Sequence, residues 1–427
     1  MSHSLSSTLP RRQFLSTLLA TSTAWAAPMA WAQGSIDPGR LVLVFLRGAY
    51  DGLSALVPHG ERAYYALRPN IAIAAPDGTA QTTIKLDDRF GLHPALAPLL
   101  PLWQQGVLAA IPAAGSPDAT RSHFDAQHHW EIGQPGRSGA GAGWLNTLAG
   151  LRETARAKPA APVAAALGVG EANPQILAGP AAVQLVPRGQ AATRQGAMGD
   201  ARTRDAMLQL YAGQDSLSQA FRAGAQSRMQ TAQTLSDDMA SPAMSAQEMR
   251  AANNGAGPAQ GLLLDAQHLG TLMRQNRQLR LGFLSAGGWD THANQGAATG
   301  ALANNLGNLA STLVQLRRDF SQPNDVVLVC SEFGRTSAEN GTRGSDHGHG
   351  NALWLMGNRV NGGRWHGQWT GLEQGMLHEG RDLPVHHDFR AIFAQVLRNA
   401  QGLTNAQIDQ LFPGFAWDGA LDGLMQG

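Results

Sequence analysis

The sequence predicts an α/β protein whose mainly parallel sheet carries helices on both faces. Apolar runs typical of buried strands alternate with helix-like segments, and this order favours parallel strands joined by helices. A second observation is that several of the strand-like runs end in loops containing Asp, Glu and His. Since 427 residues are many for one hydrophobic core, we expect one large domain with an insertion, or two domains.

Residues 1–32 have the pattern of an export signal. Arg11 and Arg12 precede a mildly apolar segment that ends at Ala30-Trp31-Ala32, whose small residues suit cleavage. The paired arginines favour a twin-arginine signal. Pro10 stands where Ser or Thr is more usual, so a general secretory signal is the alternative. We expect a periplasmic mature domain over 33–427, without a transmembrane segment because no later apolar run reaches about 18 residues.

Composition excludes some classes of partner. The formal net charge is +1, which gives no electrostatic footprint for nucleic acid or for an anionic membrane. Cys330 is the one cysteine, so an intramolecular disulfide is impossible, and its place at the end of an apolar run indicates a buried structural thiol.

The first half of the chain supplies the first strands and helices of the expected sheet. Residues 40–46 form a continuous apolar run, the expected first strand, and Arg47 and Asp51 lie in the loop at its end. Residues 94–105 are helix-like, 107–111 form the expected second strand, and a helix is expected from Ser122 through Trp130.

The middle of the chain changes in character. Residues 151–258 are rich in Ala, Gln, Gly, Met and Arg, and 201–250 has mostly helical patterns, so we treat 151–258 as an insertion or cap. The alternating pattern then resumes. The expected elements are a helix at 261–275, a strand at 279–284, a helix at 300–319, a strand beginning at 326 and a closing amphipathic helix at 388–399.

Three strand ends carry potential metal ligands. Mixed carboxylate and imidazole sets suit zinc or manganese, whereas calcium and magnesium prefer all-oxygen sets. The other interpretation is that each histidine is a loop or cap residue with hydrogen-bonded partners. The candidate ligands are Asp51 after the first strand, Asp290 and His292 after the strand at 279–284, and Glu332, Asp346, His347 and His349 after the strand at 326.

Ser122 and His123 form a second candidate group at the start of a helix. Ser122 would be a nucleophile or anion site activated by a metal, or it would simply cap the helix. Arg47 and Arg335 would neutralise an anionic substrate or form ordinary salt bridges. The chain lacks a G-x-S-x-G elbow, a P-loop and the dinucleotide glycine spacing, which disfavours α/β-hydrolases and nucleotide enzymes.

Five motifs together resemble the exported family catalogued as domain of unknown function 1501. They are FLRGAYDGL at 45–53, RSHFDAQ at 121–127, GGWDTHANQG at 287–296, SEFGRT at 331–336 and SDHGHGN at 345–351. That family is grouped with the alkaline phosphatase and sulfatase superfamily. The resemblance therefore implies a three-layer α/β/α sandwich of the alkaline phosphatase type.

The resemblance also implies roles for individual residues. Asp51 corresponds to a metal carboxylate after the first strand, and Ser122 lies where the nucleophile is expected. Asp290 with His292 resembles the pair of one metal site, although the superfamily usually spaces that pair four residues apart. Asp346 with His347 resembles the pair of the other site, and Glu332 competes for the same carboxylate role.

These expectations point to metal-assisted hydrolysis of a phosphate or sulfate ester, with a divalent metal, zinc or manganese, and a small anionic ester as substrate. The alternative is a non-catalytic periplasmic binding or assembly protein with the same fold. The sequence leaves the substrate, the metal and the oligomeric state open.

Overall fold

A ten-stranded sheet forms the centre of the computed structural model, which describes residues 38–154, 164–193, 200–238, 253–417 and 419–426. The predicted export signal, 1–32, lies outside the described residues. The strand order is β12-β5-β11-β10-β1-β9-β6-β7, with β13 paired to β5 and β8 to β9. Strand β11 runs antiparallel to both neighbours and the other pairs are parallel, so the prediction of an α/β fold with a mainly parallel sheet is confirmed.

The central strand β1 explains why the sheet is covered on both sides. Its sequence is apolar at every position and every residue is buried, as expected for a parallel strand between two layers of helices. The strands are β1 Leu41–Leu46, β5 Leu108–Gly115, β6 Ala166–Gly170, β7 Val183–Pro187, β8 Gly257–Pro258, β9 Leu281–Gly287, β10 Val326–Cys330, β11 Asn351–Gly357, β12 Arg364–Trp365 and β13 His387–Asp388.

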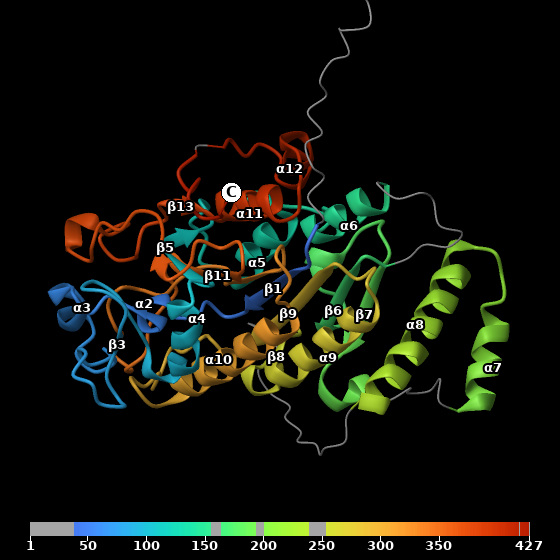
Figure 1. Ribbon diagram of the computed structural model, residues 1–427, viewed down its shortest axis with the longest axis horizontal. Coiled ribbons are helices and arrows are strands. Elements are labelled where there is room, and N and C mark those ends of the chain that lie inside the picture. The colour runs from blue at the N-terminus through green and yellow to red at the C-terminus, as the bar shows by residue number, and fades with distance from the viewer. Residues whose placement is uncertain (1–37, 155–163, 194–199, 239–252, 418, 427) are drawn as a thin grey trace, which may run out of the picture. The chain divides into compact units, whose positions relative to one another are not determined.

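Helices pack on both faces of the sheet (Figure 1). The bounds of the α-helices are α2 Gly52–Ala55, α3 Arg62–Leu67, α4 Leu100–Gln104, α5 His123–Ile132, α6 Trp144–Thr154, α7 Ala201–Leu210, α8 Ser216–Asp238, α9 Leu262–Gln275, α10 Ala301–Asp319, α11 Phe389–Asn399 and α12 Asn405–Leu411. The short 3₁₀ helices are η1 Pro94–Leu99, η2 Gln175–Leu177, η3 Gly189–Thr193, η5 Ala259–Gly261 and η6 Gln374–Met376.

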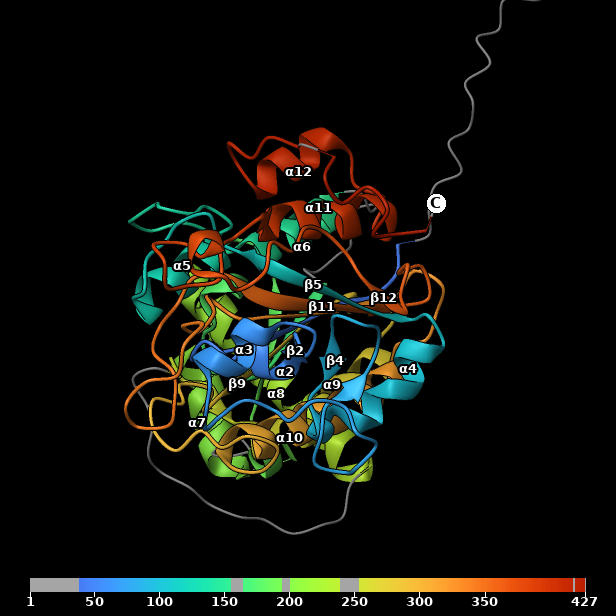
Figure 2. The ribbon, with the colours of Figure 1, turned by 90° about the vertical axis from the view of Figure 1, so that its left-hand side faces the viewer.

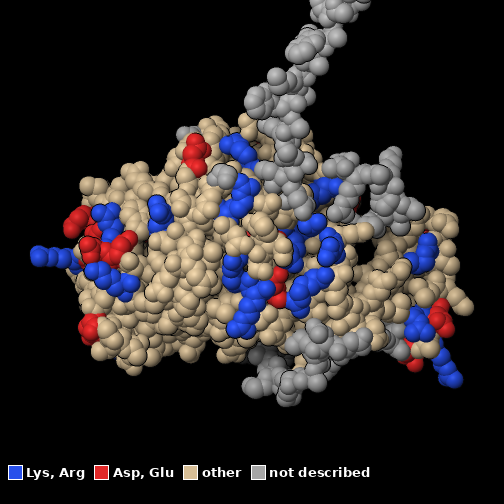
Figure 3. All heavy atoms as spheres, viewed as in Figure 1, with Lys and Arg blue, Asp and Glu red and all other residues tan. Residues whose placement is uncertain are grey.

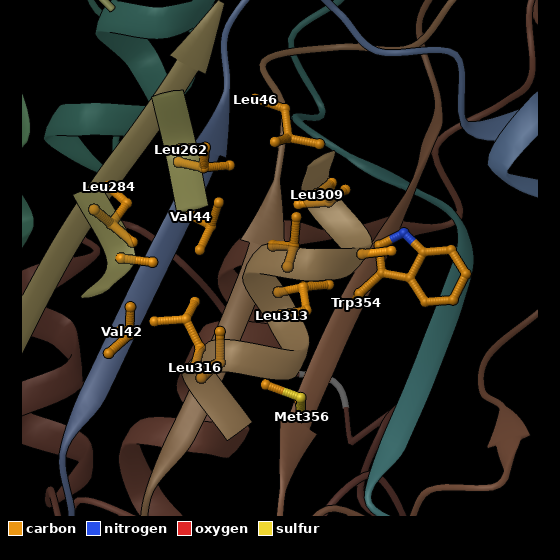
Figure 4. Packing of buried hydrophobic residues seen from close by; sticks show 14 of the residues in the cluster. Val42, Val44, Leu46, Leu262, Leu284, Leu309, Leu313, Leu316, Trp354 and Met356 are labelled. Atoms are coloured by element: carbon orange, nitrogen blue, oxygen red, sulfur yellow. The ribbon is translucent and has the colours of Figure 1, made fainter. Parts of the chain in front are cut away.

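Alternate residues of β1 belong to two different cores, because successive side chains of a strand point to opposite faces. Val42 and Val44 join the core with α9 and α10, and Figure 4 shows them with leucines of α10 such as Leu313. Leu43 and Phe45 join the core with α6, α11 and α12. Burial of one leucine side chain in either core stabilises the fold by about 2 kcal/mol.

Most expected elements are present with shifted ends. The predicted helix at 94–105 is η1 followed by α4, and Pro98 and Pro101 lie inside or at the start of these pieces. A proline lacks the N–H that a continuous helix needs, which accounts for the division. The predicted strand at 107–111 continues to Gly115 as β5. The lone thiol, Cys330, is buried as expected.

The stretch 151–258 contains more than a helical insertion. Strands β6 and β7 fall within it and both extend the main sheet beyond β9, so this part of the range belongs to the main sheet. The helical part consists of α7 and α8, and α7 buries none of its side chains. Elsewhere, β2 Leu56–Val57, β4 Gly91–Leu92 and β3 Ile84–Lys85 form a small separate sheet.

The parallel strands β1, β9 and β10 are neighbours, so their carboxyl ends meet at one edge of the sheet. In Figure 2, α5 lies toward this edge, whereas β12 and the start of the described chain lie toward the opposite edge. Within the described part of the chain, no helix combines the length and apolarity that crossing a membrane would require.

Candidate metal centre

Three imidazoles and one carboxylate converge at the carboxyl edge of the sheet. His123 is the first residue of α5, Asp290 and His292 follow β9, and His347 follows β10. His347 Nε2 lies 3.0 Å from His123 Nε2 and 3.0 Å from His292 Nε2. Asp290 Oδ1 is 2.9 Å from His292 Nε2 and 3.2 Å from His347 Nε2, and Asp290 Oδ2 is 3.5 Å from His123 Nε2.

The partners of the other ring nitrogens define where the protons lie. His347 Nδ1 is 2.9 Å from the carbonyl oxygen of Arg121, and His123 Nδ1 is 2.7 Å from Glu332 Oε1. A carbonyl oxygen accepts but does not donate, and an ionised carboxylate behaves likewise. Both Nδ1 atoms therefore carry hydrogen, and in the neutral rings the two Nε2 atoms present lone pairs to each other.

His292 repeats this arrangement. Its Nδ1 lies 3.0 Å from Asp346 Oδ1, so its Nε2 also presents a lone pair when the ring is neutral. Three imidazoles whose Nδ1–H groups donate to acceptors while their Nε2 atoms converge form the pattern of histidines prepared for a metal. Lone pairs 3.0 Å apart repel unless a cation lies between them, and a proton can be shared by only one pair at a time.

The separations fit a divalent ion. With bonds of about 2.1 Å, ligand atoms lie about 3.0 Å apart around an octahedral ion and about 3.4 Å apart around a tetrahedral one. The five contacts given above range from 2.9 to 3.5 Å, close to these values. Among the described residues, His123, Asp290 and His347 form a set of possible ligands whose ligand atoms all lie within 4.8 Å of one another.

Asp290 is the carboxylate of the centre and Arg335 fixes it in place. Arg335 Nη1 donates to Asp290 Oδ1 at 2.5 Å, and the guanidinium is also held by Ser345. Burial raises the pKa of Asp290, but hydrogen bonds from His123, His347 and Arg335 hold it well below its usual range. Since Arg335 is 2% exposed and paired with Asp290, the geometry supports the salt-bridge interpretation, in which Arg335 positions Asp290.

Glu332 orients His123 and does not reach the point of convergence. Oε1 accepts from Gly48 N and Gln127 Nε2, both at 2.8 Å, as well as facing His123 Nδ1. Ser331 Oγ donates to Oε2 at 2.8 Å. Burial raises the pKa of Glu332, but the hydrogen bond and charge of His123 and the bond from Gln127 lower it overall. Glu332, one of the candidate ligands from the sequence, thus has the contacts of a residue that orients a ligand.

Burial lowers the pKa of His123, but its hydrogen bonds to Asp290 and Glu332 and the charges of these carboxylates raise it overall to about 9. Without a metal, His123 therefore carries a proton on Nε2 as well as on Nδ1 near neutral pH, and a bound metal would replace the proton on Nε2.

Asp346 and His349, the other candidates in the loop after β10, have different positions. Asp346 Oδ1 accepts from His292 and from Asn340 Nδ2 at 2.9 Å, so it orients His292. His349 Nε2 lies 3.0 Å from the Ser116 carbonyl oxygen, and its ring stands against His378 with ring centres 4.6 Å apart. The structure does not bring His349 into the set of converging atoms.

Asp51 also lies apart from the converging atoms. Its Oδ2 is 2.6 Å from Arg68 Nη1, 2.8 Å from Ser54 Oγ and 2.7 Å from Gln295 Nε2. Burial raises the pKa of Asp51, but Arg68 and these hydrogen bonds lower it overall. An internal guanidinium therefore compensates the carboxylate that the sequence analysis treats as a metal ligand.

Arg47 and Ser122 make contacts that stabilise the fold. Arg47 is fully buried and forms ion pairs with Glu131 and Glu171, the latter at 2.6 Å from Nε, so it is not available to a substrate. Ser122 is the exposed N-cap of α5, and its Oγ accepts from Asp125 N at 3.3 Å. The capping interpretation of Ser122 is the one this geometry supports.

Gln127, Arg121 and Arg68 contribute contacts that the sequence analysis did not assign. Gln127 follows His123 by four residues on α5, so both side chains reach Glu332 from one face of the helix. That spacing is visible in the sequence, but its significance depends on Glu332 lying beside the helix. Nothing in the sequence alone pairs Arg68 with Asp51.

A protein-family model described as "Protein of unknown function (DUF1501)" matches residues 39–412. The match therefore covers the sheet and all the residues of the candidate metal centre. A search of curated proteins finds no match to the chain.

Proposed function

Since the chain belongs to the DUF1501 family, whose description leaves the activity open, we propose from the geometry of the metal centre that it is an exported metal-dependent hydrolase of phosphate or sulfate esters. The observation that carries the proposal is the convergence of three histidine Nε2 atoms and Asp290 while each Nδ1 faces an acceptor.

His123, Asp290, His292 and His347 would hold the ion. This donor set of three nitrogens and one oxygen suits zinc or manganese. A bound divalent ion would polarise an ester oxygen and neutralise part of its negative charge. The resemblance to the alkaline phosphatase and sulfatase superfamily supports the choice of ester, and the covered parallel sheet is compatible with a sandwich of that type.

The protein's own side chains would contribute orientation and access. Arg335 keeps Asp290 ionised and aimed at the histidines, and Glu332 and Asp346 fix the rings of His123 and His292. The His292 side chain is 45% exposed, so the centre opens to solvent on its side. An anionic ester would approach the ion from that side.

Metal analysis followed by an activity panel tests the proposal. The protein purified without chelators should contain a transition metal in near-stoichiometric amount and should hydrolyse an aryl phosphate or an aryl sulfate. His347→Ala should lose most of the metal and the activity. His128→Ala is a matched control on α5, because His128 contacts the Gly139 carbonyl and not the centre. Absence of bound metal, together with no turnover when zinc or manganese is added, would sink the proposal.

A non-catalytic binding or assembly protein is the second candidate, and the position of Ser122 favours it. The expected nucleophile caps α5, and Arg47 and Arg335 are engaged inside the protein. A catalytic centre should bind vanadate or phosphate in competition with its ester substrate. A binding protein should retain metal while showing neither turnover nor such competition.

A further inference from the structure

Arginines gather at the amino-terminal edge of the sheet, the edge opposite the candidate metal centre. Figure 3, which views this edge, shows blue side chains over the middle of the face with few red ones among them. Nine arginines lie in segments that begin or end at this edge: Arg40, Arg152, Arg274, Arg277, Arg280, Arg317, Arg318, Arg359 and Arg398. We call this surface the arginine face.

The topology places these residues together. Helices α9, α10 and α11 end at this edge, and each has arginine in its last turn, where a cation interacts favourably with the free carbonyl groups. Other arginines hold neighbouring segments: Arg359 Nη1 donates to Asn399 O at 2.8 Å, and Arg280 Nη1 to Pro38 O at 3.1 Å. These bonds explain the positions of the side chains but do not remove their charge.

Few carboxylates compensate the arginine face. The segments 40, 152–153, 274–280, 317–325, 358–359, 398–401 and 419–426 contain Glu153, Asp319, Asp325 and Asp422 as their acidic residues. Nine positive and four negative groups leave five positive charges. Because the whole chain has a formal net charge of +1, the remaining residues carry a net charge of −4. The near-neutral total of the chain therefore conceals a separation of charge.

We infer that the arginine face binds the surface of a bilayer containing anionic phospholipids. A cluster of several arginines on one surface is attracted to such a bilayer over about a Debye length. This interaction is separate from the proposed hydrolysis, since the arginine face and the metal centre occupy opposite edges of the sheet.

The start of the described chain favours a bilayer over other polyanions. Pro38 lies on the arginine face beside Arg280, and Gly39 N donates to Ala400 O at 3.3 Å. The predicted export signal ends at Ala32, six residues earlier, and six residues span at most about 20 Å. Chain length alone would therefore limit the separation of Pro38 from a membrane that holds such a signal to about this distance.

Arg277 and Arg318 are the residues best placed to test the inference. Both are exposed, and within the described chain neither belongs to an ion pair. Their side chains can therefore contact lipid phosphate without breaking a contact that holds the fold. By contrast, Arg40 and Arg274 neutralise Asp325 and Asp319, so replacing them would disturb packing as well as charge.

Vesicle flotation measures the binding. The mature protein, produced with export and purified from the periplasm, is mixed with vesicles of equal parts phosphatidylglycerol and phosphatidylcholine, or of phosphatidylcholine alone. The double variant Arg277→Glu/Arg318→Glu should bind the phosphatidylglycerol vesicles at least about tenfold more weakly than the wild type. The control Arg62→Glu/Arg343→Glu makes the same change in net charge at exposed positions elsewhere and should stay within about twofold.

The lipid comparison separates charge from apolar insertion. Binding to phosphatidylcholine alone reports any apolar contribution and should not differ between the two double variants. Raising the salt from 50 to 500 mM should abolish the phosphatidylglycerol-dependent part. Equal loss of binding in both double variants would overturn the inference. So would binding of soluble polyphosphate without binding of phosphatidylglycerol vesicles. Melting curves of both variants establish that each remains folded.

Discussion

The two ring nitrogens of each histidine in the candidate metal centre have different roles. The Nδ1 atom donates to an acceptor of the protein, and the Nε2 atom faces the other ligands. Glu332 is the most constrained acceptor because it is fully buried and receives bonds from Gly48, Gln127 and Ser331 besides His123. Its negative charge also increases the basicity of the His123 ring.

Glu332→Gln should weaken zinc binding by about 10- to 100-fold while the protein stays folded. The amide can still accept from His123 Nδ1 but lacks the charge, and loss of such a partner typically costs this much affinity. Competition with a chromophoric chelator measures the change. Glu339→Gln is the control because Glu339 contacts Asn70 and Ile71 away from the centre. Unchanged affinity in Glu332→Gln would contradict the assigned role.

Asp265 provides a prediction about pH. This residue of α9 is 3% exposed, and burial raises its pKa from 3.8 to about 6, although the Gly189 N–H and the charge of Arg188 act in the opposite direction. Between pH 4 and 6 the unfolded carboxyl loses its proton while the folded one keeps it. The stability that this group contributes is therefore complete below pH 4 and lost by about pH 6.

Asp265→Asn should remove the loss of stability that occurs between about pH 4 and pH 6. The shift of about two pKa units corresponds to about 3 kcal/mol, so the variant should be more stable than the wild type by up to this amount at pH 7 and about equal at pH 3.5. Its amide oxygen can still accept from Gly189 N. Urea unfolding at both pH values measures the difference. Asp205→Asn, at a position 67% exposed, should show no such pH dependence, and a variant less stable at pH 7 would refute the assignment.

Helix α5 connects the metal centre to the core. His123 opens the helix, Gln127 lies one turn later, and Trp130 donates from Nε1 to Glu332 O at 2.8 Å. Ring stacking of Trp130 on Phe389, with centres 4.0 Å apart, fixes the same helix against α11. The position of His123 is therefore set by packing along the whole helix and not only by its own hydrogen bonds.

Ser122→Ala should destabilise the protein by about 1 kcal/mol, because the helix loses its N-cap acceptor, while metal content and any ester hydrolysis are retained. Ser122→Asp should restore the cap and the stability. Thermal melting and turnover of an aryl phosphate are measured together. Complete loss of turnover in both variants, with metal still bound, would instead identify Ser122 as the nucleophile expected from the family resemblance.

The sequence predicts elements well where burial leaves a continuous apolar pattern. Strands β1 and β10 and helix α10 match the expected ranges closely. Strand β6, with the sequence ALGVG, and β7, with VQLVP, lack such a pattern and were missed. Glycine and proline weaken their strand signal, and their pairing beside β9 is a tertiary contact. The sequence therefore predicts the strands at the centre of the sheet better than the strands at its margin.

Residue roles at the site were predictable in type but not in detail. Asp290, His292 and His347 were expected as ligands, and the structure brings them together with His123. The spacing of two between Asp290 and His292 suits an extended loop, where alternate side chains point the same way. Which carboxylate contacts the ion and which orients an imidazole depends on the neighbouring ring nitrogens, and these are fixed only in three dimensions.

At the scale of the whole molecule, one sheet gives its two edges opposite properties. Parallel strands align their carboxyl ends, which gathers Asp290, His292 and His347 beside the start of α5. The same topology brings helix carboxyl termini and their arginines to the other edge. Chemistry and membrane attachment would then take place on opposite sides of the protein, leaving the metal centre open to solvent while the arginine face lies on lipid.

A metal at this centre would join segments that are far apart in the sequence, so its removal should lower the stability of the folded domain. His123 opens α5 after β5, Asp290 lies between β9 and α10, and His347 lies between β10 and β11. An ion present at 100 times its dissociation constant stabilises the native state by about 2.7 kcal/mol. For a domain of this size, that corresponds to a rise in melting temperature of a few degrees.

Differential scanning fluorimetry before and after treatment with a chelator measures this change in melting temperature. The wild type should melt a few degrees lower without metal and recover when zinc or manganese is restored. Asp290→Asn should melt at the same temperature with and without chelator, because its ion is already lost. A wild type that does not respond to chelator would show that the four side chains hold only protons.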